Sequence, residues 1–206
     1  MANRLQIVNT ALRSLSRDPI SSFEDGTSQA NLISDIYDMT VEQVMIVAAW
    51  VCLRKRSTLI ASADKPEFGF SNSFLLPTDY PVIQIIEFNK EQIFEGSVSY
   101  TGPDSYLGIT GAPNYQVEGD RLLTDSSYAD IVYIAKDTNE ANWDVHLANT
   151  VLAALKVAIA DNVGASASKT QQLQRELERL GRINRARNTQ QASPEKFRTT
   201  QYLEGR

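Results

Sequence analysis

Residues 27–56 read TSQANLISDIYDMTVEQVMIVAAWVCLRKR. Apolar side chains recur there every three or four positions, which is typical of an α-helix with one buried face. The apolar positions are Ala30, Ile33, Ile36, Tyr37, Val44 and Val47. Thr27 or Ser28 can cap the start, because either hydroxyl can accept a hydrogen bond from a free backbone N–H of the first turn. We expect the helix to run to about Leu53, with Trp50 near its end.

Further helices are predicted on both sides of this one. Residues 3–16 form an amphipathic pattern that the Asp18-Pro19 pair ends, because the residue before a proline avoids helical backbone angles. Helical periodicity returns at residues 139–163, where alanines favour close helix packing, and again at residues 165–188. The last of these helices carries a narrow apolar stripe among charged residues: Leu173, Leu177, Leu180 and Ile183.

Between the helical stretches, residues 57–137 have a different pattern. Gly, Pro, Ser and Thr are frequent, and short β-branched runs alternate with turn residues, which is typical of strands. The candidate strands are 57–61, 82–88, 92–95, 115–117, 121–124 and 131–135. We therefore assign an α+β fold. It consists of an antiparallel helical bundle formed by residues 1–56 and 138–188, an inserted small β domain at 57–137, and an extended C-terminal tail at 189–206.

The 206 residues carry a net charge of −5 that is unevenly spread. Residues 165–206 hold nine Lys/Arg and four Asp/Glu, a net +5, whereas residues 1–164 hold 11 and 21, a net −10. An acidic body repels nucleic acid. The split indicates either a solvated helix face followed by a tail, or charge complementarity between copies of the chain or with a partner.

Cysteine usage and hydropathy narrow the class of protein. Cys52 is the single cysteine, so no disulfide can form within the chain, which is consistent with assembly in a reducing cytoplasm. No apolar run reaches the ~18 residues of a membrane-spanning helix. The first residues carry no signal-peptide pattern, so we do not expect secretion by the usual route.

The sequence offers no catalytic or metal-binding pattern. The single histidine, His146, lies in helical sequence and is interpreted as structural, and one His with one Cys essentially excludes a His/Cys zinc site. No P-loop, Rossmann glycine pattern or nucleophile elbow is present. Carboxylate pairs such as Asp35/Asp38 and Glu176/Glu178 fall on amphipathic helices, where solvated charge is expected. We therefore expect no catalytic residues, no metal, no cofactor and no small-molecule substrate.

One face of the predicted last helix carries four arginines spaced by four, three and three residues: Arg175, Arg179, Arg182 and Arg185. Such a face can meet phosphates, an acidic protein surface, or solvent alone. The tail places apolar anchors between cations, a pattern that favours ordering on a partner. Its candidate contacts are Lys196, Phe197, Arg198, Tyr202 and Leu203. We predict that both sets contact a partner protein or a neighbouring subunit.

Five strings carry a resemblance to a known family. In order they are NTALRSLSRDPISSFEDGTSQA (9–30), LISDIYDMTVEQVMIVAAWVCLRKRSTL (32–59), FLLPTDYPVIQI (74–85), YQVEGDRLLTD (115–125) and IVYIAKD (131–137). Together they resemble phage tail tubular protein A, the adaptor ring of short-tailed phages, over most of residues 3–163. The family's Tyr-Asp pair, and its Trp before a basic residue and a Leu, match Tyr37, Asp38, Trp50, Arg54, Arg56 and Leu59. The chain departs from the family at Ser16, where the family often has Gly, and at Pro81-Val82-Ile83, and its tail matches least.

The resemblance implies a structural and not an enzymatic role. The family forms a dodecameric ring in the neck of the virion, between the head portal and the tail tube or nozzle, and DNA passes through its channel as non-specific cargo. Within the same structural class, the alternative is a head-completion connector of a long-tailed phage. Two other classes remain open: a tail-associated hydrolase, which requires a cleft with a perturbed carboxylate pair, and a DNA-packaging accessory protein, which requires salt-sensitive DNA binding by the arginine face.

Overall fold

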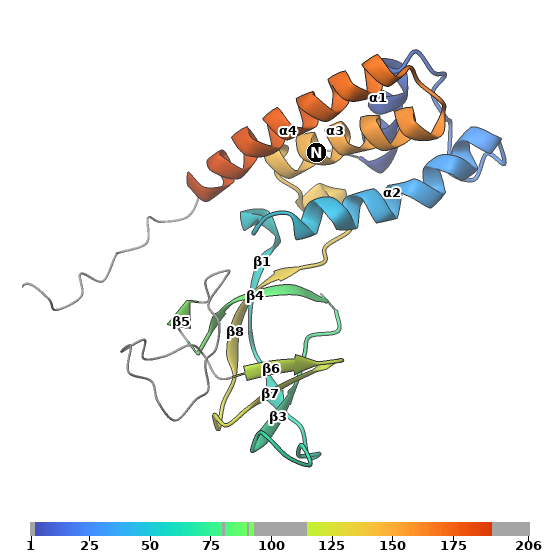
Figure 1. Cartoon of the computed structure of the whole chain (residues 1–206). Coiled ribbons are helices and arrows are strands. Elements are labelled where there is room, and N and C mark those ends of the chain that lie inside the picture. Colours follow the sequence, from blue (N-terminus) through green and yellow to red (C-terminus); the bar gives the residue numbers. More distant parts are fainter. Residues whose placement is uncertain (1–2, 80, 90, 93–114, 191–206) are drawn as a thin grey trace, which may run out of the picture.

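A computed structural model of the chain describes residues 3–79, 81–89, 91–92 and 115–190. The described residues have a mixed α+β fold with four α-helices and two antiparallel sheets. The helices lie together at one end of the molecule and the two sheets at the other (Figure 1). The tail residues 191–206, which include all five predicted tail contacts, lie outside the described residues.

The helices are α1 (Arg4–Ser14), α2 (Ser28–Ile46), α3 (Val145–Asn162) and α4 (Ala167–Gln190). Three of them begin after a residue whose side-chain oxygen accepts a hydrogen bond from the backbone N–H of the first turn: Asn3, Thr27 and Asp144. These caps satisfy donors that the helix itself leaves without partners. Of the two predicted caps of α2, Thr27 and Ser28, Thr27 is the one that the structure shows.

The turn after α1 explains how the chain accommodates Ser16. This residue has a φ of 55°, in the left-handed region that favours glycine. The backbone N–H of Ser16 bonds to the carbonyl of Arg13, and that of Arg17 bonds to the carbonyl of Leu12. These bonds close the end of the helix. Ser16 thus adopts the conformation that a glycine would adopt with less strain.

The second helix ends earlier than its sequence pattern predicts. It stops at Ile46, and a short 3-10 helix, η1 (Val51–Leu53), follows instead of a continuation to Leu53. The indole N–H of Trp50 donates to the Val44 carbonyl at 2.9 Å. In a continuing α-helix that carbonyl would accept from the backbone N–H four residues later. The Trp50 indole therefore occupies the Val44 carbonyl in place of a backbone N–H. The basic residues that follow Trp50 lie in a strand.

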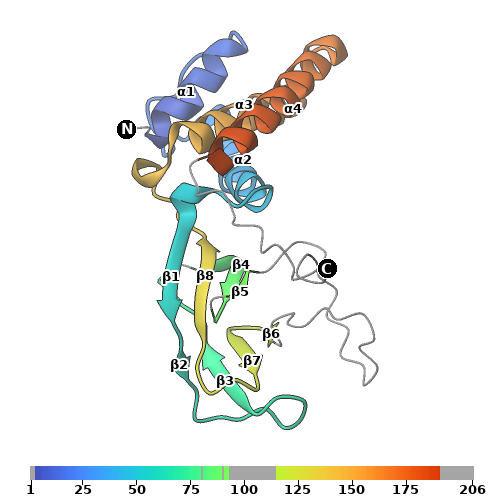
Figure 2. The ribbon, with the colours of Figure 1, turned by 90° about the vertical axis from the view of Figure 1, so that its left-hand side faces the viewer.

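The strands are β1 (Arg54–Thr58), β2 (Ile60–Ala61), β3 (Asn72–Leu75), β4 (Val82–Phe88), β5 (Glu91–Gln92), β6 (Tyr115–Glu118), β7 (Arg121–Thr124) and β8 (Asp130–Ala135). One sheet has the order β1-β8-β4-β5 and the other β2-β3-β7-β6. Leu59 alone separates β1 from β2, so one extended segment passes from the first sheet into the second (Figure 2). The buried side chain of Leu59 packs between the two sheets.

Most of the predicted strands lie where the sequence places them, with two corrections. The first strand begins at Arg54 and not at residue 57, because the segment after Trp50 pairs with β8 at once, Arg54 opposite Ile134. Strand β3 was not predicted, because its first two residues, Asn72 and Ser73, are polar and break the apolar alternation. The predicted strand at 92–95 lies outside the described residues after its first position.

Two hydrophobic cores meet at β8. Ile134 belongs to the core among the helices, whereas its neighbours Tyr133 and Ala135 belong to the core between the sheets. Successive side chains of a strand point to opposite faces, so β8 is buried on both. Ile83 and Ile86 of β4 also pack against the helical core. This shared strand holds the helical and β parts together.

A substitution at Trp50 tests the assignment of the helical core. Its side chain is 0% exposed and packs in the core among the helices, so Trp50→Ala should lower the free energy of unfolding by about 3–5 kcal/mol. Val47→Ala is the matched control, because Val47 lies three residues away with 57% of its surface exposed. It should change stability by less than about 0.5 kcal/mol. Urea unfolding of both variants measures the difference, and equal midpoints would contradict this assignment of the core.

Candidate interaction surface

The helical end carries an apolar groove between α2, α3 and α4. It has a volume of about 580 Å³. Val44, Val47, Ala154 and Leu177 supply its apolar wall. Gln43, Glu178, Arg182 and Arg185 supply polar and charged groups. Apolar walls with a few polar groups at the edge are the usual composition of a binding groove.

The groove depends on how α4 is attached. Of its predicted apolar stripe, Leu173 is buried, Leu177 and Leu180 are half-buried and Ile183 is exposed. The buried face continues instead through Gly181, Asn184 and Asn188. Asn184 donates from Nδ2 to Oγ1 of Thr150 on α3 at 3.0 Å. The last turns of α4 are thus attached by amide hydrogen bonds in place of aliphatic packing. Small and polar side chains leave space that leucines would fill, and the groove lies over this part of the helix.

Asn188 connects α4 to the segment between α2 and β1. Its Oδ1 accepts from the backbone N–H of Val51 at 2.8 Å, and its Nδ2 donates to the carbonyl of Ala49 at 2.8 Å. Asn188 is itself 4% exposed, and buried backbone groups need such partners. Sequence reasoning missed both asparagines, although the positions 177, 181, 184 and 188 have the helical spacing of one face.

An exposed apolar ridge runs along α2 beside the groove. We define the α2 ridge as Met39, Ile46 and Val47, which are 61%, 65% and 57% exposed. Met39 and Ile46 lie two turns apart on the same face. Ile46 also lines a second hollow of about 250 Å³ with Ile83 of β4 and the Glu42–Lys136 ion pair. Apolar surface thus extends from the groove across α2 to the sheet, and such contiguous patches indicate contact with a partner.

The four predicted arginines fall on one exposed side of α4, but they do not form one site. Arg182 and Arg185 line the groove, whereas Arg175 and Arg179 are exposed nearer the start of the helix, outside it. A carboxylate at the groove would therefore meet two guanidinium groups at most. Arginine beside an apolar wall is typical of the anchoring residues of protein interfaces.

The Tyr-Asp pair singled out in the sequence has a structural role. The Tyr37 hydroxyl donates to Oε1 of Glu140 at 2.9 Å, and burial raises the pKa of the phenol. The Arg4 guanidinium lies 4.2 Å from the centre of the Phe23 ring and 4.4 Å from that of Tyr37, and it pairs with Asp38 at 3.2 Å. These contacts join α1, α2 and the segment before α3. The cluster is held together by cation–π and hydrogen-bond interactions.

The side chains that could be reactive or could bind a metal are also dispersed. Half-buried Cys52 has a pKa raised to about 11 by burial, which keeps the thiol protonated and weakly reactive at neutral pH. The backbone carbonyl of His146 accepts from Oγ1 of Thr150 within α3. Among the described residues no group of three or more His, Cys, Asp or Glu side chains could hold a metal ion. Within the same residues, no helix is long and apolar enough to cross a membrane.

Comparison with protein-family models and with curated proteins found no match for this chain.

A substitution at Asn188 tests how α4 is attached. Asn188→Ala should lower the free energy of unfolding by roughly 1–3 kcal/mol, because it leaves the half-buried Val51 N–H and Ala49 carbonyl without the partners that Asn188 supplies. Asn162→Ala is the control, since the Asn162 amide is exposed and bonds within its own helix. Thermal melts of the two variants should differ clearly. A melting temperature of Asn188→Ala equal to that of Asn162→Ala would show that this attachment is unimportant.

Proposed function

We propose that this chain is a structural subunit of a phage virion, a head-to-tail adaptor that packs into a closed ring on the portal and connects it to the tail tube or nozzle. The motif order over most of residues 3–163 supports the family assignment. Within this proposal the helices form an antiparallel bundle, the β domain is an insertion in it, and the C-terminal tail reaches the portal. The role is mechanical: the subunit seals and extends the portal, and it assembles in the host cytoplasm.

The observation that carries the proposal is the combination of groove and α2 ridge at the helical end. Exposed Ile46 and Val47 lie between two hollows, so the surface has both projections and recesses. An apolar surface of this kind is stabilised when a partner removes it from water. A ring formed from one subunit type repeats a single contact between copies. We infer that this surface supplies one side of the repeated contact.

Charge supports the same arrangement. Arg182 and Arg185 give the groove a positive rim, and the body of the chain carries the net −10 of residues 1–164. Opposite charges on two meeting surfaces orient subunits and disfavour wrong registers. The acidic body also suits a channel through which DNA must slide, because it does not retain phosphates.

Substitutions in the α2 ridge test whether it forms the subunit contact. The double variant Ile46→Asp, Val47→Asp should fold with a nearly unchanged melting temperature, because both side chains are exposed. Ring assembly on the portal protein should weaken at least about 100-fold, since the contact would have to remove two carboxylates from water in place of two apolar side chains. Sedimentation velocity of the chain mixed with its portal measures assembly. Val145→Asp, an exposed position on α3, is the control and should assemble normally. Full assembly of the double variant would exclude the ridge from the contact.

Binding to nucleic acid separates this role from that of a packaging accessory. The isolated chain should bind duplex DNA with a Kd no tighter than ~10⁻⁴ M at physiological salt, because its body is acidic. Fluorescence anisotropy over a range of salt concentrations measures this. Tight binding that weakens steeply with salt, and that is lost in an Arg175→Gln, Arg179→Gln variant, would instead favour the packaging role.

A further inference from the structure

The β end of the molecule has an outward sheet face that is buried in part. Ser73 on β3 lies opposite Leu123 on β7, which lies opposite Gln116 on β6. Residues opposite one another share a face, and the alternate residues Phe74 and Leu122 fill the core between the sheets. Ser73 and Leu123 therefore point away from that core. They are nevertheless only 3% and 8% exposed, because the loop of residues 62–71 covers this face.

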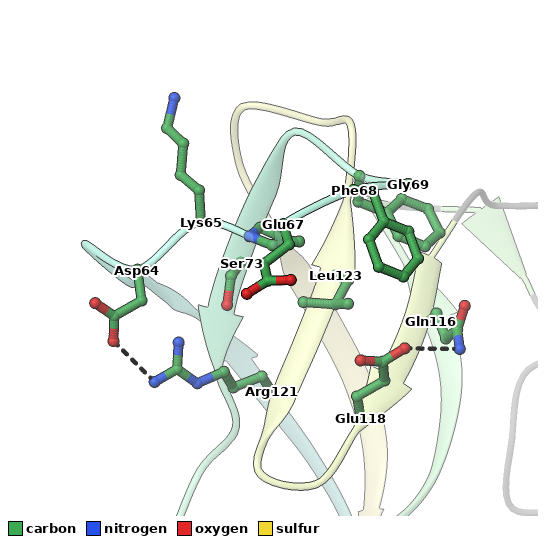
Figure 3. Close-up of a pocket in the computed structure, with 12 residues that line it drawn as sticks. Asp64, Lys65, Glu67, Phe68, Gly69, Ser73, Gln116, Glu118, Arg121 and Leu123 are labelled. Atoms are coloured by element: carbon green, nitrogen blue, oxygen red, sulfur yellow. Dashed lines mark hydrogen bonds and ion pairs between the residues drawn. The ribbon is translucent and has the colours of Figure 1, made fainter.

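A hollow of about 360 Å³ remains between this loop and the sheet (Figure 3). Leu123 lies at its centre in that view, with Phe68 on one side and Arg121 on the other. The loop contributes Glu67, Phe68 and Phe70, and the strands contribute Ser73, Gln116, Glu118 and Arg121. Small-molecule sites span about 300–1,000 Å³, so this hollow is at the small end and suits a single side chain.

The charge of the hollow is negative. The Arg121 guanidinium is paired with Asp64 at 3.1 Å, and Lys65 extends away from the other side chains in Figure 3. Glu67 makes no hydrogen bond or ion pair with any residue that the structure describes. Glu118 accepts a hydrogen bond from the neutral amide of Gln116 at 2.9 Å. Two carboxylates thus face the hollow without a cation of their own.

Ser73 gives a second and independent indication of a ligand. Ser73 lines the hollow, and its hydroxyl is almost fully buried and has no hydrogen-bond partner among the described residues. Buried hydroxyl groups nearly always have a partner, because leaving one unpaired costs free energy. Phe68, by contrast, exposes 87% of its surface at the edge. The site thus combines an aromatic ring, two carboxylates and a free hydroxyl.

We propose that this hollow binds an arginine side chain of a protein partner. A guanidinium group is planar, so it stacks on a phenyl ring, and its five N–H donors can reach carboxylates and a hydroxyl together. Its positive charge complements Glu67 and Glu118. A lysine ammonium has three donors and no planar face to stack. This inference does not depend on the ring-subunit proposal, because the site lies at the β end, away from the α2 ridge.

The test uses the full chain and a minimal probe, N-acetyl-L-arginine N-methylamide, titrated in a ¹H–¹⁵N NMR experiment. Saturable shifts are expected at the backbone amides of Phe68, Gly69 and Leu123. The citrulline analogue has the same shape without the charge and should bind at least about fivefold more weakly, because charge-assisted hydrogen bonds are roughly twice as strong as neutral ones. Absent shifts, equal binding of the citrulline analogue, or a lysine analogue that binds as tightly would each overturn the assignment to arginine.

Variants separate binding from folding. Glu67→Gln with Glu118→Gln should weaken the arginine probe at least about fivefold, whereas Glu24→Gln, at an exposed position outside the hollow, should leave its affinity unchanged. Ser73→Ala should raise the melting temperature, because it removes an unpaired buried hydroxyl, and should also weaken the probe. A purely structural serine would not combine these two effects. Unchanged affinity in both the glutamine double variant and Ser73→Ala would overturn the proposal.

Discussion

Strand β8 lies between two hydrophobic cores, and its register positions both halves of the molecule. Ile134 packs among the helices and Tyr133 between the sheets. A slip of one residue would exchange these faces and place each side chain in the wrong core. On one side β8 pairs with β1, which follows α2, and its own end leads to α3. The separation of α2 and α3, and with it the groove, therefore depends on this strand.

Polar attachments complete the helical end and keep the groove open. Asn184 and Asn188 fix α4 to α3 and to the segment after α2, in positions where larger apolar side chains would fill the space. Asp137, just after β8, is buried and accepts hydrogen bonds from the backbone of Asn139 and the side chain of Asn142. Hydrogen bonds of this kind specify one arrangement more narrowly than apolar contacts do. The surface beside α2 is consequently a defined shape that a partner can recognise.

Local sequence patterns predict much of this fold but little of its surface. The helices and most strands follow from periodicity and caps, because the signals lie within a few residues of one another, although α3 begins at Val145 and not at residue 139. The end of α2 does not follow from such signals, because it depends on the hydrogen bond from the Trp50 ring to the Val44 carbonyl. The groove, the role of Asn188 and the burial of Ser73 arise from residues far apart in the sequence, and no local pattern reports such contacts. The arginines were recognisable as a face, but only the packing of α4 separates the two at the groove from the two outside it.

The most direct test of the ring-subunit account is the mass of the particle that the chain forms, measured by native mass spectrometry with and without the portal protein of the same phage. The account predicts that the portal ring gains a fixed, whole number of chains that matches its own symmetry, as a closed ring requires. A portal whose mass is unchanged, or that gains a variable number of chains, would contradict it.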